Sequence, residues 1–217
     1  MTRSGDRAKR AFDVVVGSAV LVLSMPIQAA VAIAIRRSMG APVLFRQLRP
    51  GKDGVAFELI KFRTMRHPDA SHVTDEERLT PLGSFLRSTS LDELPSLLNV
   101  LRGEMSLVGP RPLLVEYLPH YSPDQLRRHS VRPGITGLAQ ISGRNSIPWE
   151  AKFAKDLEYV DGQSFWMDLK ILIATIMFVL RRKGITGDGE ATARRFVGCD
   201  DLPGDRPPRQ DVHLPND

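Results

Sequence analysis

Residues 14–35 read VVVGSAVLVLSMPIQAAVAIAI, an apolar run of 22 residues without a charged side chain. As a straight helix this run would be about 33 Å long, which is enough to cross the hydrocarbon core of a bilayer. Ser24 and Pro26 stand near its middle, where a proline removes a backbone donor and clashes with the preceding turn. Broken there, each half would cover only about half of the bilayer. The run therefore predicts a membrane element that is interrupted at its centre.

Basic residues flank this apolar run on both sides. Four of them precede it within residues 3–10, and Arg36 and Arg37 follow it directly. Because basic residues favour the cytoplasmic side of a membrane, both ends are expected on that face. Residues 1–40 are therefore predicted to form an N-terminal re-entrant membrane hairpin, a helix-break-helix with Ser24 and Pro26 at the break.

Three other interpretations of the run stay open. A spanning helix with a proline kink is tolerated in membranes. A helix of a soluble core can have the same composition. A cleaved signal peptide would have a shorter apolar region and a small-residue cleavage site with few charges after it.

Composition narrows the classes of partner. The chain has 217 residues, which suits one domain of ordinary size, and a formal charge of +5 with a pI near 9.6. Polyanions are the natural partners of such a chain. Aromatic residues make up only 6% of it and do not alternate with basic residues, which argues against a nucleic-acid surface. The single cysteine, Cys199, excludes an intramolecular disulfide.

Residues 41–185 have the composition of a globular domain. Near-alternating apolar residues in 43–47 and 57–62 predict a β-hairpin, joined by the turn-rich residues 49–54. Leucines at helical spacing predict a helix over 91–102. The predicted fold class is α+β, mostly helical, with this small hairpin and the re-entrant membrane element.

Weaker signals fill in the remaining segments. We expect a polar loop that runs into a helix over 67–78, a short helix over 123–129, a loop over 132–137, and longer helices over 149–160 and 165–180. The last helix is apolar apart from Asp168 and Lys170, and either belongs to the core or lies in the membrane interface. Residues 186–217 are polar and contain four prolines, and a flexible tail is expected there.

Two adjacent acids, Asp92 and Glu93, stand at the start of the leucine-patterned helix. Ser90 and Glu93 match a capping box. If Asp92 is the N-cap instead, Pro95 falls at a position whose N–H has no partner within the helix. In either case the helix dipole favours the anionic forms. Taken alone, acids at such positions are more often structural than catalytic.

Cations accompany this acid pair in the sequence. Lys61, Arg63 and Arg66 stand in one short segment, Arg87 precedes Asp92 by five residues, and Arg111 lies between two prolines. Arginine offers a planar fork of donors to phosphate oxygens, and lysine offers a compact charge. A carboxylate close to such cations is expected to stay deprotonated and to serve as a nucleophile or a metal ligand. The combination predicts phosphate chemistry at a lipid surface.

Six motifs, in this order, resemble those of the bacterial sugar transferases, the monotopic phosphoglycosyl transferases. They are KRAFD (9–13), FRTM (62–65), LDELP (91–95), NVLRGEMS (99–106), VGPRP (108–112) and RPGITG (132–137). The likeness covers residues 7–185. Two further stretches, RPLLVEYLP (111–119) and GRN (143–145), resemble the small members that begin protein N-glycosylation.

The resemblance implies a two-step transfer through a covalent intermediate. Asp92 would attack the sugar-bearing phosphate of a UDP-sugar, such as UDP-N,N'-diacetylbacillosamine, and release UMP. Undecaprenyl phosphate would then accept the phosphosugar. Glu93 would assist by binding Mg²⁺ together with Asp92, or by handling a proton. Lys61, Arg87 and Arg111 are the expected phosphate contacts.

The resemblance also implies a setting. Arg132, Arg144 and Asn145 are weaker candidates for substrate contacts. The enzyme would be monotopic, on the cytoplasmic face of the bacterial inner membrane, in contact with lipid and upstream of further glycosyltransferases. In the family the break has adjacent Ser and Pro residues, whereas Met25 separates Ser24 from Pro26 here.

Two other functions stay open at this stage. A membrane-tethered module could bind anionic lipid or nucleotide through the same cations without turnover. A nucleic-acid-binding protein would explain the pI, but it gives no reason for the apolar run or the acid pair.

Overall fold

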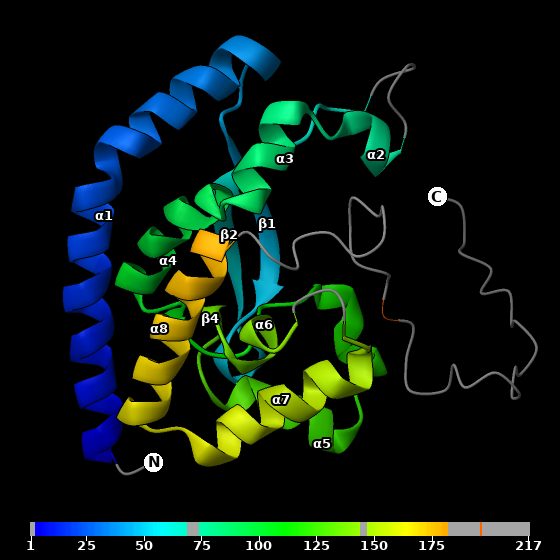
Figure 1. Cartoon of the computed structure of the whole chain (residues 1–217). Helices are drawn as coiled ribbons and strands as arrows, with labels where there is room; N and C mark the ends of the chain where they lie inside the picture. The colour runs from blue at the N-terminus through cyan, green and yellow to red at the C-terminus, as the bar shows by residue number, and fades with distance from the viewer. Residues whose placement is uncertain (1–2, 69–73, 144–146, 182–195, 197–217) are drawn as a thin grey trace, which may run out of the picture.

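The computed structural model describes residues 3–68, 74–143, 147–181 and 196 (Figure 1). The α-helices are α1 (Arg3–Met39), α2 (Asp75–Arg78), α3 (Pro81–Ser88), α4 (Leu97–Arg102), α5 (Pro123–Leu126), α6 (Leu138–Ile141), α7 (Trp149–Gly162) and α8 (Phe165–Arg181). The strands are β1 (Leu44–Pro50), β2 (Ala56–Phe62), β3 (Ser106–Val108) and β4 (Gly134–Thr136). Short 3-10 helices are η1 (Lys52–Gly54), η2 (Leu91–Ser96), η3 (Val115–His120) and η4 (Arg127–Ser130). The predicted α+β class, mostly helical, is confirmed.

α1 continues through Pro26 and bends, rather than separating into two helices (Figure 1). Side chains satisfy part of the backbone around the proline. The Ser24 hydroxyl donates to the Leu21 carbonyl at 3.1 Å, and the Gln28 amide donates to the Ser24 hydroxyl at 2.9 Å. The carbonyl that Pro26 leaves without its helical donor is that of Val22, four residues earlier. The re-entrant path through a bilayer stays a prediction.

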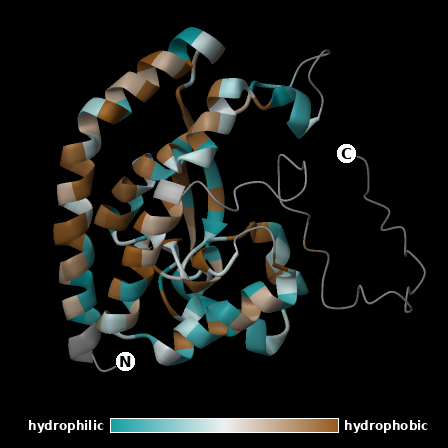
Figure 2. Cartoon of the chain, viewed as in Figure 1, coloured by the Kyte–Doolittle hydropathy of each residue, from teal (hydrophilic) through white to brown (hydrophobic). Residues whose placement is uncertain are grey.

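The middle of α1 presents its apolar side chains to the outside. Of its most apolar stretch only 17% is buried, and α1 alone among the described helices is long and apolar enough to cross a membrane. Leu23 is 78% exposed and Val22 is 62% exposed. Figure 2 shows hydrophobic residues along this helix and along α8. Burial this low disfavours a soluble-core helix.

The beginning of α1 is fixed to the rest of the protein by buried polar contacts. Asp13 is 2% exposed; it accepts from the Ser106 hydroxyl at 2.8 Å and from the Leu107 amide at 3.2 Å. Lys9 forms a 2.7 Å ion pair with Asp168 of α8. These contacts tie α1 to β3 and α8, since a buried carboxylate needs such partners.

β1 and β2 form the predicted antiparallel hairpin, with a register that runs from Leu44 opposite Phe62 to Pro50 opposite Ala56. The other side of β2 is covered by side chains. Asn99 Oδ1 accepts from the Ile60 amide at 3.1 Å, and the Ser96 hydroxyl donates to the Ile60 carbonyl at 2.7 Å. Backbone groups of β2 that β1 does not pair are thereby satisfied.

A second pair of strands was not predicted. β3 and β4 pair in parallel, so the expected loop over 132–137 is partly wrong. The two chains approach so closely that a Cβ on Gly109 would lie 2.3 Å from the Arg132 carbonyl oxygen, and one on Gly134 would lie 2.1 Å from the Gly109 nitrogen. Glycines that signalled a loop are needed here for backbone packing.

The other expected helices are present, but they begin or end at different residues. The longer helices are confirmed as α7 and α8, the segment 123–129 divides into α5 and η4, and the segment 67–78 ends in α2. On α8, Asp168 and Ile171 are buried while Trp166 is 69% exposed, as an interfacial helix requires. The expected tail over 186–217 lies outside the described residues except for Phe196, which is buried against an aromatic cluster. The division at residues 40 and 185 stays a prediction.

Replacing Asp13 by alanine tests the attachment of α1. The change leaves the Ser106 hydroxyl and the Leu107 amide buried without their acceptor. We expect a loss of roughly 2 to 4 kcal/mol, or about 5 to 15 °C in Tm, measured by thermal unfolding in detergent. Asp6→Ala, an exposed acid on the same helix, should change Tm by less than about 2 °C. Equal Tm values for the two variants would contradict this role of Asp13.

Candidate active site

The acid pair lies in η2, immediately after a residue in the left-handed region. Ser90 has φ 56° and ψ 17° and makes no side-chain capping hydrogen bond. The Glu93 amide instead donates to the Ser90 carbonyl at 3.2 Å. Both capping predictions are therefore wrong, because an N-cap needs an extended backbone and Asp92 lies inside the 3-10 helix. Non-glycine residues at positive φ cost energy and often mark functional sites.

Glu93 is the meeting point of two cations. Lys61 Nζ and Arg111 Nη2 both donate to its Oε1, at 2.7 and 2.8 Å. Burial raises the pKa of Glu93, but the charges of Arg111 and Lys61 and their hydrogen bonds outweigh it and hold this pKa well below its usual range. Glu93 is therefore ionised throughout the physiological pH range.

Asp92, the neighbouring residue, is in the opposite situation. Burial, and then the charge of Glu93, raise its pKa to about 6, although the nearby cations oppose the shift. The side chain is 9% exposed. The expectation that the cations keep the carboxylate deprotonated thus holds for Glu93, whereas Asp92 takes up a proton at about pH 6.

The strand and helix before the acids supply two of the cations. Lys61 comes from β2, whose neighbouring residue Ile60 is hydrogen bonded to Ser96 of η2. Arg87 comes from α3, and its Nε donates to the Thr64 hydroxyl at 3.0 Å. Gly83, one turn earlier, allows this approach, since a Cβ there would lie 1.8 Å from the Thr64 carbonyl oxygen. The charge of Arg87 acts on Asp92 and opposes the rise of its pKa.

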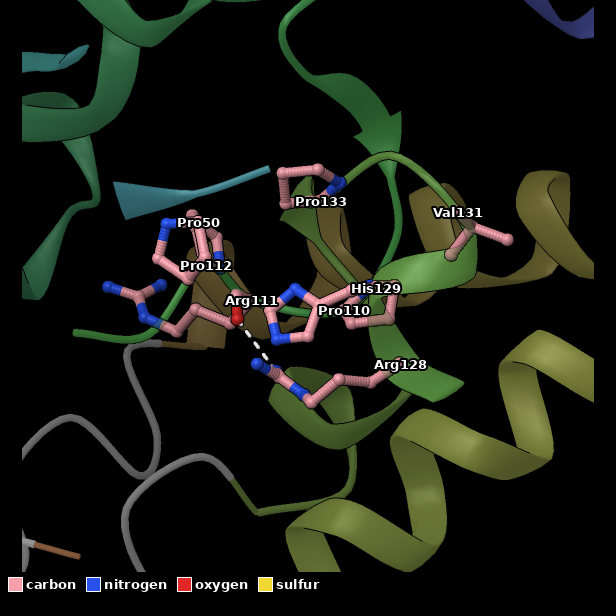
Figure 3. Close-up of a pocket in the computed structure, with 8 residues that line it drawn as sticks. All are labelled: Pro50, Pro110, Arg111, Pro112, Arg128, His129, Val131 and Pro133. Carbon is pink, nitrogen blue, oxygen red and sulfur yellow. Dashed lines mark hydrogen bonds between the residues drawn. The ribbon is translucent and has the colours of Figure 1, made fainter. Parts of the chain in front are cut away.

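Arg111 is held by the loop that leaves β3. The Gly109 amide donates to the Thr136 carbonyl at 2.9 Å, and the Gly134 amide donates to the Pro110 carbonyl at 3.0 Å. Figure 3 shows prolines around this loop, with Arg128 directed at the Arg111 carbonyl. The side chain of Arg111 is 45% exposed, and its guanidinium reaches Glu93.

The structure thus brings together five of the predicted residues. They are Asp92, Glu93, Lys61, Arg87 and Arg111. Arg132 is not brought to the acids by any described contact; its Nε donates to the Gly103 carbonyl at the end of α4, at 2.8 Å. Arg144 and Asn145 lie outside the described residues.

Several contributors were missed from the sequence. Thr64 orients Arg87, and Arg128 and Asp156 support the Arg111 loop. Arg128 stands in the segment 123–129, for which the sequence predicted only a short helix. Asp156 carried a usable signal, because it stands three residues after Phe153 on the buried face of α7.

The donor set fits a magnesium ion that is shared with a phosphorylated substrate. Among the described residues no group of three or more His, Cys, Asp or Glu side chains could hold a metal alone. Mg²⁺ commonly uses only one or two protein carboxylates and completes its shell with phosphate oxygens and water. Asp92 and Glu93 meet that requirement, with the cations on only one oxygen of Glu93.

This arrangement suits nucleophilic attack at phosphorus. Asp92 is ionised at neutral pH, and its raised pKa makes it a stronger nucleophile than an ordinary carboxylate. Cations beside it can bind the phosphate oxygens that gain charge during the transfer. The site therefore places an ionisable carboxylate beside cations that are able to bind phosphate.

Comparisons with known proteins agree with this chemistry. Residues 4–182 match the family described as bacterial sugar transferase. The chain is 50% identical over 197 residues to the uncharacterized sugar transferase EpsL of Bacillus subtilis, covering 89% of this chain and 98% of that protein. It is 43% identical to a UDP-glucose:undecaprenyl-phosphate glucose-1-phosphate transferase of Klebsiella pneumoniae, over 77% of this chain but 39% of that protein. A Caulobacter vibrioides protein of the same name is 40% identical, over 81% of this chain and 70% of its own length.

Asp92→Asn should stabilise the fold at alkaline pH. An acid whose folded pKa lies above its unfolded value destabilises the protein once pH exceeds the folded pKa, and this cost is absent below the unfolded pKa. With a rise from 3.8 to about 6, the amide should gain about 2 to 3 kcal/mol at pH 8 and almost nothing at pH 3.5. Thermal unfolding at both pH values measures this. Asp53→Asn, the same substitution at an exposed turn, is the matched control. The same gain for Asp92→Asn at both pH values would contradict the assignment.

Proposed function

Because the chain belongs to the bacterial sugar transferase family, we propose that it transfers a phosphosugar from a UDP-sugar to undecaprenyl phosphate and releases UMP. The family makes it an enzyme of the phosphoglycosyl transferase type. The observation that carries the proposal is the contrast between two adjacent acids, one with a raised pKa and the other fixed by two cations.

In the first step the Asp92 carboxylate attacks the phosphorus that bears the sugar. A bond forms between Asp92 and this phosphorus, and the bond to the bridging oxygen of the diphosphate breaks. UMP leaves with that oxygen, and the phosphosugar stays on Asp92. A pKa of about 6 supports this role, because Asp92 is then ionised but still basic at neutral pH.

In the second step a phosphate oxygen of undecaprenyl phosphate attacks the same phosphorus. The bond to Asp92 breaks, the carboxylate is regenerated, and the product is undecaprenyl diphosphosugar. Two successive displacements at one phosphorus need the same cations twice. Lys61, Arg87 and Arg111 surround Asp92 and are proposed to bind the phosphates in both steps.

Glu93 is proposed to orient the cations and to contribute a metal ligand, rather than to accept a proton. Its lowered pKa makes it a poor base near neutral pH. Mg²⁺ would be held by Asp92 or Glu93 together with the diphosphate, and when bound it would neutralise charge that otherwise repels the attacking carboxylate.

The donor sugar is proposed from two kinds of evidence that point to different compounds. The stretches 111–119 and 143–145 favour an N-acetylated amino sugar such as N,N'-diacetylbacillosamine, for protein glycosylation. The Klebsiella pneumoniae and Caulobacter vibrioides relatives carry names that specify UDP-glucose. A donor panel should therefore include both types.

UMP release tests the reaction directly. Purified enzyme with Mg²⁺ and undecaprenyl phosphate should release UMP from one UDP-sugar of the panel, and Asp92→Asn should reduce the rate to background because an amide is no anionic nucleophile. Without acceptor, the wild type should gain the mass of one phosphosugar, which the variant should lack. Asp53→Asn, which carries the same substitution at an exposed turn, should retain the activity.

Two outcomes would reject parts of this proposal. Binding of UDP-sugars without UMP release by the wild type would favour a tethered binding module. Near-normal turnover by Asp92→Asn would reject the covalent intermediate on Asp92.

The re-entrant path of α1 forms part of the proposal, because one substrate is soluble and the other is anchored in the membrane. The exposed apolar middle of α1 and the bend at Pro26 support it (Figures 1 and 2). With both ends of α1 on the cytoplasmic face, Asp92 would work at the height of the lipid headgroups.

Pro26→Ala should straighten α1 and bias it toward spanning the membrane, so that the N-terminus moves across and the contacts of Asp13 and Lys9 with β3 and α8 break. The measurement is labelling of Thr2→Cys from each side of the membrane, in a Cys199→Ser background that removes the native thiol. Labelling from the cytoplasmic side alone, both with the native Pro26 and in the Pro26→Ala variant, would contradict the prediction.

A further inference from the structure

Arg128 and Asp156 form a buried ion pair behind the candidate active site. Arg128 Nη2 and Nε lie 2.7 and 3.1 Å from Asp156 Oδ2, and the side chains are 2% and 5% exposed. Buried ion pairs rarely add stability relative to apolar residues of the same volume, because both charges lose their hydration. The pair by itself is therefore weak evidence of a stabilising role.

The same guanidinium reaches the loop after β3 that carries Arg111. Arg128 Nη2 also donates to the main-chain carbonyl of Arg111, at 2.7 Å (Figure 3). Asp156 thus fixes the guanidinium on one side, and the guanidinium fixes the loop on the other. Flanking prolines restrict φ on both sides of Arg111, and the Gly134 amide fixes the Pro110 carbonyl at 3.0 Å, so the Arg128 contact adds a restraint on the Arg111 carbonyl itself.

Arg111 is the residue that this contact would align. Its guanidinium binds Glu93 Oε1 at 2.8 Å, and its charge acts on Asp92. The side chain is long, so a small shift of its main chain moves the guanidinium relative to both acids. A displacement of about 1 Å in a group that binds the reacting phosphate can reduce the rate about 100-fold.

Two neighbouring side chains, His129 and Arg49, contact other carbonyls. His129, the next residue, is neutral at physiological pH because burial, and then the charge of Arg128, lower its pKa to about 4. Its Nδ1 lies 3.3 Å from the Gly51 carbonyl, on the hairpin side. Arg49 contacts the Pro112 carbonyl at 3.4 Å, a longer and weaker contact than that of Arg128.

We propose that Arg128, oriented by Asp156, is a positioning residue that holds the Arg111 loop so that the Arg111 guanidinium stays over the acid pair. The inference rests on the proposed transfer reaction, for which Arg111 binds phosphate. Arg128 itself touches neither substrate nor reacting atoms. It acts on the reaction through the main chain of Arg111.

The test uses Arg128→Met/Asp156→Leu, which removes both charges and leaves neither one buried alone. Its matched control is Arg127→Met/Asp161→Leu, the same substitutions at the adjacent arginine and its exposed partner. We expect kcat/KM for UMP release to fall roughly 10- to 100-fold in the first variant and less than about 3-fold in the control. Arg128→Lys keeps a charge opposite Asp156 without the fork of donors, and should show a smaller loss.

Two readouts separate positioning from a general loss of structure. The first is the pH profile of kcat/KM. Displacing the positive charge of Arg111 from Asp92 should move the acidic limb to higher pH. The other charged groups that act on Asp92 are Glu93, Lys61 and Arg87. The second is coupling between the two sites. In an enzyme that already carries Arg111→Met, adding Arg128→Met/Asp156→Leu should lower kcat/KM by less than about 3-fold.

The outcomes distinguish this inference from the proposed function. An acidic limb that does not move, or losses that multiply in the Arg111→Met background, would overturn the positioning role while UMP release by the wild type stands. No UMP release by the wild type from any donor would overturn the proposed function, and the inference with it. If the paired variant fails to fold, the pH profile of Arg128→Lys decides in the same way.

Discussion

One carboxylate oxygen holds the candidate site together. Glu93 Oε1 accepts from Lys61 of β2 and from Arg111 of the loop after β3, while Glu93 itself belongs to η2. Three segments that are distant in the sequence therefore meet at one atom. Because the Lys61 and Glu93 side chains are only 18% and 16% exposed, leaving either charge unpaired would be costly, so these two must stay together, and the more exposed Arg111 joins them from the loop. The position of Asp92 follows from this constraint, since it precedes Glu93 in the same 3-10 helix.

Two adjacent acids thus acquire different chemistry from their surroundings alone. Glu93 receives both hydrogen-bonded cations and stays ionised, whereas Asp92 receives burial and the repulsion of Glu93, and its pKa rises to about 6. The division of roles resembles other sites in which neighbouring carboxylates have separated pKa values. If the cations were bound to Asp92 in place of Glu93, the difference between the two pKa values would be lost. The orientation of the Arg111 loop therefore matters as much as the presence of the acids.

The sequence was most informative where local patterns decide structure. Alternation predicted the hairpin, and leucine spacing predicted helical structure around the acids. Charge type alone did not separate Lys61 from Arg63, whose guanidinium donates to the Met39 and Gly40 carbonyls instead; the family resemblance selected Lys61, Arg87 and Arg111. Contacts between remote segments were missed. The β3–β4 pairing occupies three residues on each strand, among glycines and prolines that signal loops. Arg128 is buried only because α7 supplies Asp156, a partner 28 residues away that no local pattern around Arg128 indicates.

The two attachments of α1 have a geometric consequence. Its beginning is fixed through Asp13 and Lys9, and its end packs Val31 and Ile35 against Phe62 and the α3 residue Leu86. Between these points the helix cannot rotate or slide, so the number of residues sets which side chains face outward. An insertion of one residue would turn everything beyond it by about 100° and shift it by about 1.5 Å. The number of residues between the two attachments therefore sets the direction of the apolar side chains near Pro26, and inserting or deleting one residue would change it.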